Sequence, residues 1–524
     1  MEQQNTDDKS KKRIEVIKKL EQIESNLPMI EHPRNGRIIS DFATELSTEL
    51  KEKKIIFLQE TTNSVVRILE TSNTSSIIDL NSKAFIGIIE ANLNPYIFTK
   101  KEGVVVKTIK SVEEKITKIV LELDVFKNSL DVIKQKLDVP LPIIYKNKLT
   151  FVKHGYDERF NSWLSPNSPK ISNPNMTLEE ANEIFNEMLE GFCFTDSQDR
   201  VNAIAGFITP FIKGLSKRED KIYDFKSPLL IYQANRSRAG KDYLAGITGV
   251  IYEGNSVTEH PITEQSEEEF SKKIITALLS GKKIYHSGNN KGELNNSVFE
   301  SAITSNIVSG RKLGGNIQVQ LDNFMEYSIS ANIGFIYTPD IENRAIKIGL
   351  FFATEDENSR TFKHINLYDW ILERRGDVLS AIYTLIRIWD EKGRPKGSLP
   401  FTSFPEWAEI CGGIMESCDL GNPCVKYDRE DEGGDDMTKD MKILFEEMYD
   451  VFGDKYVTLQ DIATKRDELK IEAFLELNLY DVIQKRKFFK TISKFIGREL
   501  SGILLTVDDK SKKPHRRKLK FSKI

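Results

Sequence analysis

An apolar segment that runs into a Gly-Lys pair constrains the fold of this chain more than any other feature. Residues 229–234 read LLIYQA, and an apolar-periodic segment follows directly after Gly240-Lys241. This pattern predicts a buried strand, a loop over 235–240 and a helix that begins at Lys241. The first backbone N–H groups of such a helix have no partner within the helix, so they are available to an anion.

The spacing of the Gly-Lys pair is that of a phosphate-binding loop, G-x4-G-K-[ST], in which backbone N–H groups and the lysine hold nucleotide phosphates. Two positions differ from this pattern. Asn235 stands at the first glycine, where it can adopt a left-handed backbone, and Asp242 stands at the serine or threonine. The Asp242 carboxylate could hold a metal ion, or it could cap the helix. A chance Gly-Lys pair between a strand and a helix is the simple alternative.

These residues predict a site for ATP, with Mg2+ as the metal and Asp242 as its ligand. The predicted nucleotide-binding residues are Asn235, Arg236, Ser237, Arg238, Ala239, Gly240, Lys241, Asp242 and Tyr243.

The composition argues against several classes of protein. The 524 residues are 39% hydrophobic and 29% charged, which is ordinary for a globular protein, and the length predicts about three domains. No apolar run of about 18 residues is present, so a membrane span is not expected. The N-terminus is too charged for a signal peptide, and four cysteines give no disulfide framework, so we expect a cytoplasmic protein.

Strand-like and helix-like segments alternate between residues 228 and 352, which predicts an α/β core. The expected fold class is a multi-domain α/β protein. Its P-loop core would carry a helical lid and be flanked by a mixed α+β N-terminal region and a C-terminal winged helix. The predicted segments are a charged N-terminal helix or tail (1–35), an α+β domain (36–165), a helical connector (176–225), the P-loop domain with its lid (226–425), an acidic linker (426–437) and the winged helix (438–524). Within the α+β domain we expect one long amphipathic helix over 112–137 and a hairpin that turns at 146–148.

The end of the chain is strongly basic, although the net charge of the whole is only −4. Residues 485–524 contain 14 lysine and arginine residues against three acidic ones. Apolar residues fall on one face of the predicted helix and basic residues elsewhere, while the hairpin tip at 510–518 would form a wing. The pattern predicts DNA binding mainly through phosphates, and a solubilising tail without a partner is the alternative. The predicted DNA-binding residues are Lys487, Lys490, Lys494, Arg498, Lys512, Lys513, Arg516, Arg517 and Lys518.

Several stretches together resemble one family, the AAA+ ATPases encoded by phages, plasmids and genomic islands. These accompany primases or are fused to them, and they are similar to the cassette-chromosome helicases of staphylococci. The resemblance implies ATP-driven unwinding of DNA by a homo-oligomeric, hexameric ring, with a primase or another replication protein as a possible partner. The stretches that carry it are ANRSRAGKDYLAGITGVIYEG (234–254), GRIISDFATEL (36–46), FVKHGYDERF (151–160), KGELNNSVFESAITSNIVSGRKLGG (291–315), DIENRAIKIGL (340–350), RRGDVLSAIYTLIRIWDEKGRP (374–395) and SFPEWAEICGGIM (403–415).

The chain departs from this family where hydrolysis is organised. The family's Walker B strand ends in Asp-Asn, but here Gly288 stands at the aspartate and only Asn289 remains. The family's sensor Gly-Asn-Asn reads Ala331-Asn332-Ile333-Gly334, which displaces its polar asparagine. One arginine, Arg344, is left of the family's pair before the last core strand. The resemblance makes Arg344 the finger that reaches a neighbour's γ-phosphate, and a surface ion pair is the alternative.

Two other carboxylates could replace the missing acid. Glu269, in EQSEEEF, matches an acidic position that precedes the Walker B strand in the family, but acids are also favoured at any helix N-terminus. Asp322, in VQLDNF, resembles the end of a Walker B strand, but the alternating polar residues before it also fit an exposed strand and turn. The predicted catalytic residues are Lys241, Glu269, Asn289 and Arg344.

Three functions remain open from the sequence. An ATP-driven helicase requires hydrolysis despite the altered acid and sensor positions. A hydrolysis-deficient replication initiator or accessory protein requires only nucleotide and DNA binding. A defence or regulatory protein that uses the same scaffold is the third.

Overall fold

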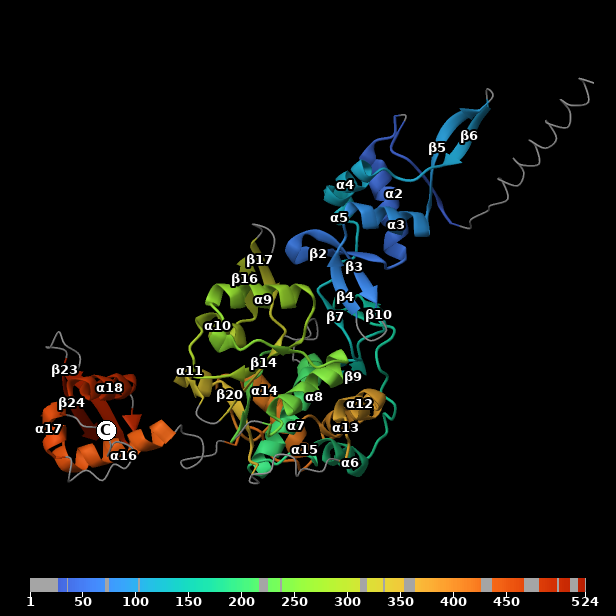
Figure 1. Ribbon diagram of the computed structural model, residues 1–524. Coiled ribbons are helices and arrows are strands. Elements are labelled where there is room, and N and C mark those ends of the chain that lie inside the picture. Colours follow the sequence, from blue (N-terminus) through green and yellow to red (C-terminus); the bar gives the residue numbers. More distant parts are fainter. Residues whose placement is uncertain are drawn as a thin grey trace, which may run out of the picture.

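The computed structural model describes residues 27–34, 36–70, 75–101, 104–215, 225–235, 238–311, 318–332, 335–352, 363–425, 436–465, 480–496, 499–508 and 517–523. These residues form a mixed α/β protein with several separate sheets (Figure 1). The predicted N-terminal helix and nearly all of the predicted acidic linker lie outside the described residues.

A sheet of five parallel strands forms the centre of the core. In spatial order its strands are β13 (Thr258–Glu259), β14 (Ile284–Asn290), β18 (Glu326–Asn332), β12 (Leu229–Ala234) and β20 (Ala345–Leu350). The three central strands are almost wholly buried, as strands of a parallel sheet with both faces covered must be. Because all the strands are parallel, their carboxyl ends meet at one edge, which is where ligands bind in such sheets.

The predicted order of strand, loop and helix at 229–254 is confirmed. Strand β12 is followed by helix α8 (Lys241–Glu253), which contacts β12, β14 and β18. Helix α7 (Ser197–Ile212) packs on β20 and on α8. Helix α6 (Leu178–Leu189), capped by Thr177 as a capping box, packs on α13 (Arg375–Glu391).

The core region contains further helices and strands. They are α9 (Glu267–Leu279), β15 (Glu293–Leu294), α10 (Ser297–Thr304), β16 (Ile307–Arg311), β17 (Gln318–Asp322), β19 (Ile336–Tyr337), α11 (Pro339–Glu342), α12 (Leu367–Glu373), α14 (Pro405–Trp407) and α15 (Gly413–Ser417). One continuous apolar cluster joins these elements to the five-stranded sheet.

The N-terminal region contains small sheets and short helices. Its elements are β1 (Met29–Glu31), α2 (Ile39–Glu52), β2 (Ile56–Gln59), β3 (Ser64–Glu70), β4 (Ser75–Asp79), α3 (Ser82–Asn92), β5 (Asn94–Lys101), β6 (Val104–Ile109), α4 (Glu114–Glu122), α5 (Asp124–Lys127), β7 (Gln135–Leu137), β8 (Pro142–Tyr145), β9 (Lys148–Phe151), β10 (Gly155–Asp157) and β11 (Ser162–Leu164). The predicted hairpin is confirmed as β8 and β9, with positive φ at Lys146 and Asn147 as a tight hairpin turn requires.

The prediction of one long helix over 112–137 is wrong. Helix α4 ends at Glu122, Leu123 has an extended backbone with ψ 126°, and α5 then begins at Asp124. The last residues of the segment form strand β7, which pairs in parallel with β11. The apolar spacing is real, but three elements share it, because the burial and pairing of β7 beside β11 override a weak local preference for helix.

The C-terminal residues form a unit with its own apolar core. Its elements are α16 (Asp436–Phe452), β21 (Tyr456–Val457), α17 (Leu459–Thr464), α18 (Val482–Ile492), β22 (Glu499–Leu500), β23 (Ile503–Asp508) and β24 (Lys518–Lys523), drawn in orange and red in Figure 1. The strands form one antiparallel sheet in the order β21-β24-β23-β22. The apolar face predicted for the α18 segment consists of Phe488, Ile492, Phe495 and Ile496; the first three are buried and Ile496 is partly buried against the same core. Among the described residues, no helix has the length and apolar character needed to cross a membrane.

Candidate functional site

The loop between β12 and α8 bends through two residues with left-handed backbones. Arg238 has φ 61° and Gly240 has φ 94°, and Gly240 is the N-cap residue of α8. Arg236 and Ser237 lie outside the described residues. Because Gly240 forms no side-chain cap, the first backbone N–H groups of α8 lie open at the carboxyl edge of the sheet.

Asn235 does not take the role that its position suggested. Its φ is not positive, and its side chain pairs in both directions with the backbone of Phe352, at 3.0 Å each way. Its own N–H donates to Leu350 O. Asn235 therefore extends the pairing between β12 and β20, and the left-handed positions of the loop lie further along it.

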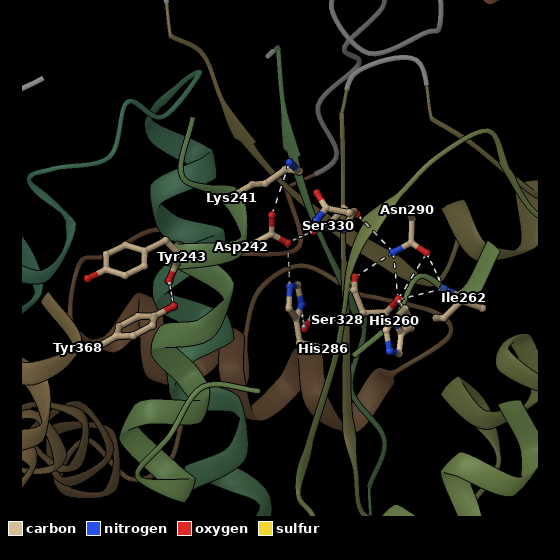
Figure 2. Close-up of polar contacts among 12 residues, drawn as sticks. Lys241, Asp242, Tyr243, His260, Ile262, His286, Asn290, Ser328, Ser330 and Tyr368 are labelled. Carbon is tan, nitrogen blue, oxygen red and sulfur yellow. Dashed lines mark hydrogen bonds and ion pairs between the residues drawn. The ribbon is translucent and has the colours of Figure 1, made fainter. Parts of the chain in front are cut away.

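Lys241 and Asp242 open helix α8 at this edge, as Figure 2 shows. Lys241 is buried, and its Nζ lies 3.6 Å from Asp242 Oδ2. Asp242 Oδ1 accepts a hydrogen bond from Ser330 Oγ on β18 and lies 3.5 Å from His286 Nε2 on β14. The Asp242 carboxylate thus leans across the strand ends and does not cap its own helix, so the capping alternative is wrong.

The charge of Asp242 is well supported. Burial by itself would raise its pKa, but hydrogen bonds from His286 and Ser330, together with the charge of Lys241, hold the pKa of Asp242 at about 2. His286 is itself fixed, because its Nδ1 lies 2.9 Å from Ser328 Oγ and its ring meets Tyr232 edge-on. An ionised, oriented carboxylate therefore stands beside the start of α8.

Gly288 lies directly behind this carboxylate. A Cβ on Gly288 would collide with Thr258 Cγ2 and would lie 2.9 Å from Asp242 Oδ1. The place where the family resemblance expects an acid therefore has no room for a side chain while Asp242 holds its present position.

The two asparagines that end β14 behave differently. Asn289 is exposed, with φ 54°, and its backbone N–H donates to Ser330 Oγ at 3.1 Å. Asn290 is buried: its Oδ1 accepts from Ile262 N–H at 2.9 Å, and its Nδ2 donates to Ser287 O at 2.9 Å. Asn289 thus lies at the site's rim, whereas Asn290 braces the strand end from behind.

Tyr243 faces helix α12, which lies in the segment predicted to form the lid. Its Oη accepts from Leu367 N–H at 2.9 Å, and its ring stacks on Tyr368 with centroids 4.2 Å apart (Figure 2). Tyr368 Oη donates to Tyr243 O, and burial raises the pKa of Tyr368 to about 12. Gly246, one turn along α8, leaves the space that Tyr368 Oη occupies. Tyr243 therefore connects the loop helix to the lid.

The other predicted catalytic residues lie elsewhere. Glu269 is exposed in the first turn of α9, and no hydrogen bond or ion pair between described residues joins it to Lys241 or Asp242. Arg344 forms an ion pair with Asp340 at 2.8 Å, so the surface-pair alternative holds within this chain. Asp322 is exposed at the end of β17, which forms a two-stranded hairpin with β16, as the alternative for that residue expected.

Sequence reasoning missed His286, Ser328 and Ser330. The signal was present, because residues two apart on a strand face the same side of a sheet. His286 on β14 pairs in register with Ser328 on the neighbouring β18, and Ser330 follows two residues later. Only the pairing of β14 with β18 shows that His286 lies beside the two serines.

The residues present fit a magnesium ion held together with a nucleotide. Among the described residues there is no group of three or more histidines, cysteines or carboxylates that could hold a metal by themselves. Mg2+ beside a nucleotide commonly uses one or two carboxylates, with phosphate and water oxygens completing its shell. Asp242 offers one such carboxylate, about a third exposed, beside the lysine of the loop.

The structure describes part of the predicted DNA-binding set. Lys487 is exposed on α18, and Lys518 is exposed at the start of β24, directly after the partly buried Arg517. The side chains of Lys490 and Lys494 lie outside the described residues, as do Arg498, Lys512, Lys513 and Arg516.

No protein-family model matches the sequence, and no curated protein matches it. Among solved structures, an apo structure of the NrS-1 C-terminal region aligns with 91% of this chain and 99% of that chain, at 10% identity and a TM-score of 0.39. The SCCmec type IV Cch, described as an active helicase, aligns with 90% of this chain and 92% of that chain, at 11% identity and a TM-score of 0.33. A JCV helicase aligns with 48% of this chain and 69% of that chain, at 13% identity and a TM-score of 0.22. TM-scores this low do not establish a shared arrangement, so function is inferred below from the residues themselves.

Proposed function

We propose that this chain is an ATP-binding DNA replication protein of the helicase type, with an AAA+-like P-loop core and a C-terminal winged helix. The observation that carries the proposal is the start of α8. A left-handed Gly240, a buried Lys241 and uncapped backbone N–H groups meet at the carboxyl edge of a parallel sheet. An anion with several negative oxygens is the ligand that such a helix start stabilises.

The residues of this site would divide the work of binding. The backbone of 238–241 would hold the phosphates. The Lys241 side chain would give up its contact with Asp242 and neutralise the charge of the phosphates instead. Asp242 would hold Mg2+, which neutralises the phosphates and orients them for attack by water. Tyr243, through Leu367 and Tyr368, would transmit the state of the site to the lid.

The C-terminal unit supports DNA binding as the second part of the proposal. Its described elements, which are a helix, a strand, two helices and three strands, suit a winged helix, with α18 as recognition helix and the last two strands, β23 and β24, as wing. Lys487 and Lys518 are exposed on these two elements. Such contacts go mainly to phosphates, so binding would weaken steeply with salt.

Ring assembly is a further part of the proposal and follows the family resemblance. Arg344 would then act on a neighbour's nucleotide, which requires it to leave its ion pair with Asp340. That pair is partly exposed, so breaking it costs little. A mobile genetic element as host, a hexameric ring and a primase partner belong to this proposal as well.

A second candidate function is a hydrolysis-deficient replication initiator or accessory protein. Two residues favour this second function. Gly288 places no acid at the end of β14, and the amide of Asn332 at the end of β18 is exposed, so neither would order the water that attacks the phosphate. Single positioned groups of this kind contribute several orders of magnitude to phosphoryl transfer.

One experiment separates these functions. ATP affinity and ATP turnover, with and without single-stranded DNA, would be measured for the wild type, Lys241→Ala and the control Lys291→Ala, an exposed lysine after β14. The helicase proposal expects DNA-stimulated turnover that only Lys241→Ala removes. Binding without turnover supports the accessory protein. Equal ATP affinity in all three proteins, or none, would reject the nucleotide site.

A further inference from the structure

The site contains one carboxylate, and it is on the helix instead of the strand. Asp242 is the second residue of α8, and its Oδ1 lies against Gly288 on β14. A Cβ at Gly288 would approach that oxygen to 2.9 Å. A side chain at 288 therefore requires Thr258 Cγ2 and the Asp242 carboxylate to shift from their present positions.

The two neighbouring strands hold the Asp242 carboxylate in a fixed orientation. Ser330 on β18 donates to Oδ1, and His286 on β14 lies 3.5 Å from the same oxygen. His286 is buried and held at its other nitrogen by Ser328 at 2.9 Å. Both of these contacts are made to Oδ1. The other carboxylate oxygen, Oδ2, faces Lys241 Nζ at a distance of 3.6 Å.

A mere partner for Lys241 would not need this support. A neutralising carboxylate acts at any orientation within a few ångströms, because the attraction between charges depends on distance and only weakly on angle. Groups that hold a metal-ligating side chain by hydrogen bonds to its far side are typical of metal sites. The arrangement of His286, Ser330 and Asp242 has that form.

We infer that helix α8 supplies the magnesium-holding carboxylate of this site in place of strand β14, with Asp242 as the ligand and His286 and Ser330 as its positioning residues. The inference rests on the proposed function, because it concerns Mg2+ that binds together with ATP. It adds that His286 and Ser330, one on each of two neighbouring strands, orient this carboxylate for the metal.

The test is the gain in ATP affinity that Mg2+ produces, measured as the ratio of the dissociation constants in EDTA and in Mg2+. Asp242→Ala, which leaves no oxygen ligand at 242, is expected to reduce this gain to about onefold, and His286→Ala to reduce Mg2+ affinity about tenfold or more. His286→Gln, which can still donate to Asp242, is expected to recover part of it. Glu259→Gln, at the same edge of the sheet but paired with Lys282, is the control and should keep the full gain.

The carboxylate can also be moved from the helix to the strand. The variant Asp242→Ala with Gly288→Asp places a carboxylate on β14 instead of α8, and it includes Thr258→Ser because Thr258 Cγ2 blocks a Cβ at 288. This triple variant should recover the Mg2+ gain that Asp242→Ala loses, while Thr258→Ser alone should not change it. Thermal unfolding of each variant would show whether it folds, and if the triple variant does not, the Asp242 and His286 variants decide.

Each result has a definite meaning. A full Mg2+ gain in folded Asp242→Ala would overturn the inference, and so would an unchanged gain in His286→Ala. The proposed function would still stand in both cases if Lys241→Ala loses ATP affinity. Failure of the wild type to bind ATP would instead remove the proposed function itself.

Discussion

The two edges of the five-stranded sheet carry the same kinds of side chain and use them differently. At the amino edge, Lys213 and Glu326 form a buried ion pair at 2.8 Å. Lys213 also donates a hydrogen bond to Phe225 O at 2.7 Å, and Ser227 donates one to Glu326. At the carboxyl edge, Lys241 and Asp242 are 3.6 Å apart, and Asp242 is about a third exposed.

The difference separates a packed ion pair from a binding site. A buried pair with several protein partners gains little from an added ligand, because its desolvation cost is already offset by those partners. A looser pair beside open backbone N–H groups can exchange its partner for a phosphate at low cost. The presence of a lysine and a carboxylate therefore does not define the site, whereas their spacing and exposure do.

The largest effect is expected from removing one member of the amino-edge pair. Glu326→Ala leaves Lys213 buried without its counter-charge and should lower the free energy of unfolding by about 3–5 kcal/mol in urea titrations. The double variant Lys213→Met with Glu326→Leu should recover most of that loss, and ATP affinity of both folded proteins should be that of the wild type. A loss of less than about 1 kcal/mol in the single variant would show that the two edges do not differ as described.

A smaller effect is expected behind the carboxyl edge. Asn290→Ala removes two buried hydrogen bonds, the shorter of the two that the Ile262 N–H donates and the one to Ser287 O, and should cost about 1–3 kcal/mol of stability. Its exposed neighbour provides the control, because Asn289→Asp tolerates the same left-handed backbone and should change stability by less than about 0.5 kcal/mol. Equal losses in both variants would contradict the bracing role of Asn290.

The pH dependence of stability tests the amino edge in another way. Burial, with the nearby charge of Lys213, lowers the pKa of Lys226 to about 7, below that of the unfolded chain. Between these two pKa values the unfolded chain binds more protons than the folded protein. Lys226 therefore lowers the free energy of unfolding fully below pH 7, and this destabilisation declines as the pH rises toward 10.

Lys226→Met should therefore stabilise the protein by about 1–2 kcal/mol at pH 6, and this advantage should shrink steadily between pH 7 and pH 10. Lys272→Met, which removes an exposed lysine paired with Glu268, is the control and should show no such trend. Urea unfolding at several pH values measures both. An advantage that grows with pH would contradict the lowered pKa.

The smallest effect is expected in the C-terminal unit, which has an apolar core of its own and contributes to neither edge of the five-stranded sheet. Lys487→Gln should weaken DNA binding a few-fold and reduce the slope of log affinity against log salt by about one, because it removes one phosphate contact. ATP affinity should not change. The same substitution at Lys455, exposed outside α18 and the hairpin, is the control. Identical slopes in both variants would remove Lys487 from the DNA contact.

The amino-acid sequence determined the local elements of the core. The strand that ends at Ala234, the helix that begins at Lys241 and the cap at Thr177 all follow from short-range rules of periodicity and capping. The turn of the hairpin at 146–147 follows likewise, because the backbone conformation there depends on neighbouring residues alone.

Tertiary structure decided the elements whose backbone finds a distant partner. The segment 112–137 has helical spacing, yet its end pairs with β11 as strand β7. Asn235 looked like a left-handed loop residue, yet the backbone of Phe352 holds it in an extension of the sheet. Pairing across the chain outweighed local preference in both cases, because each buried polar backbone group must find a partner.

The site divides in the same way. The sequence alone identified Lys241 and Asp242 as the charged residues at the start of a helix, since only local spacing was needed. It could not show that Asp242 occupies the space beside Gly288, or that His286 and Ser330 hold it there. Those contacts join residues about 40 to 90 positions apart, and they exist only because β18 lies between β12 and β14 in the folded sheet.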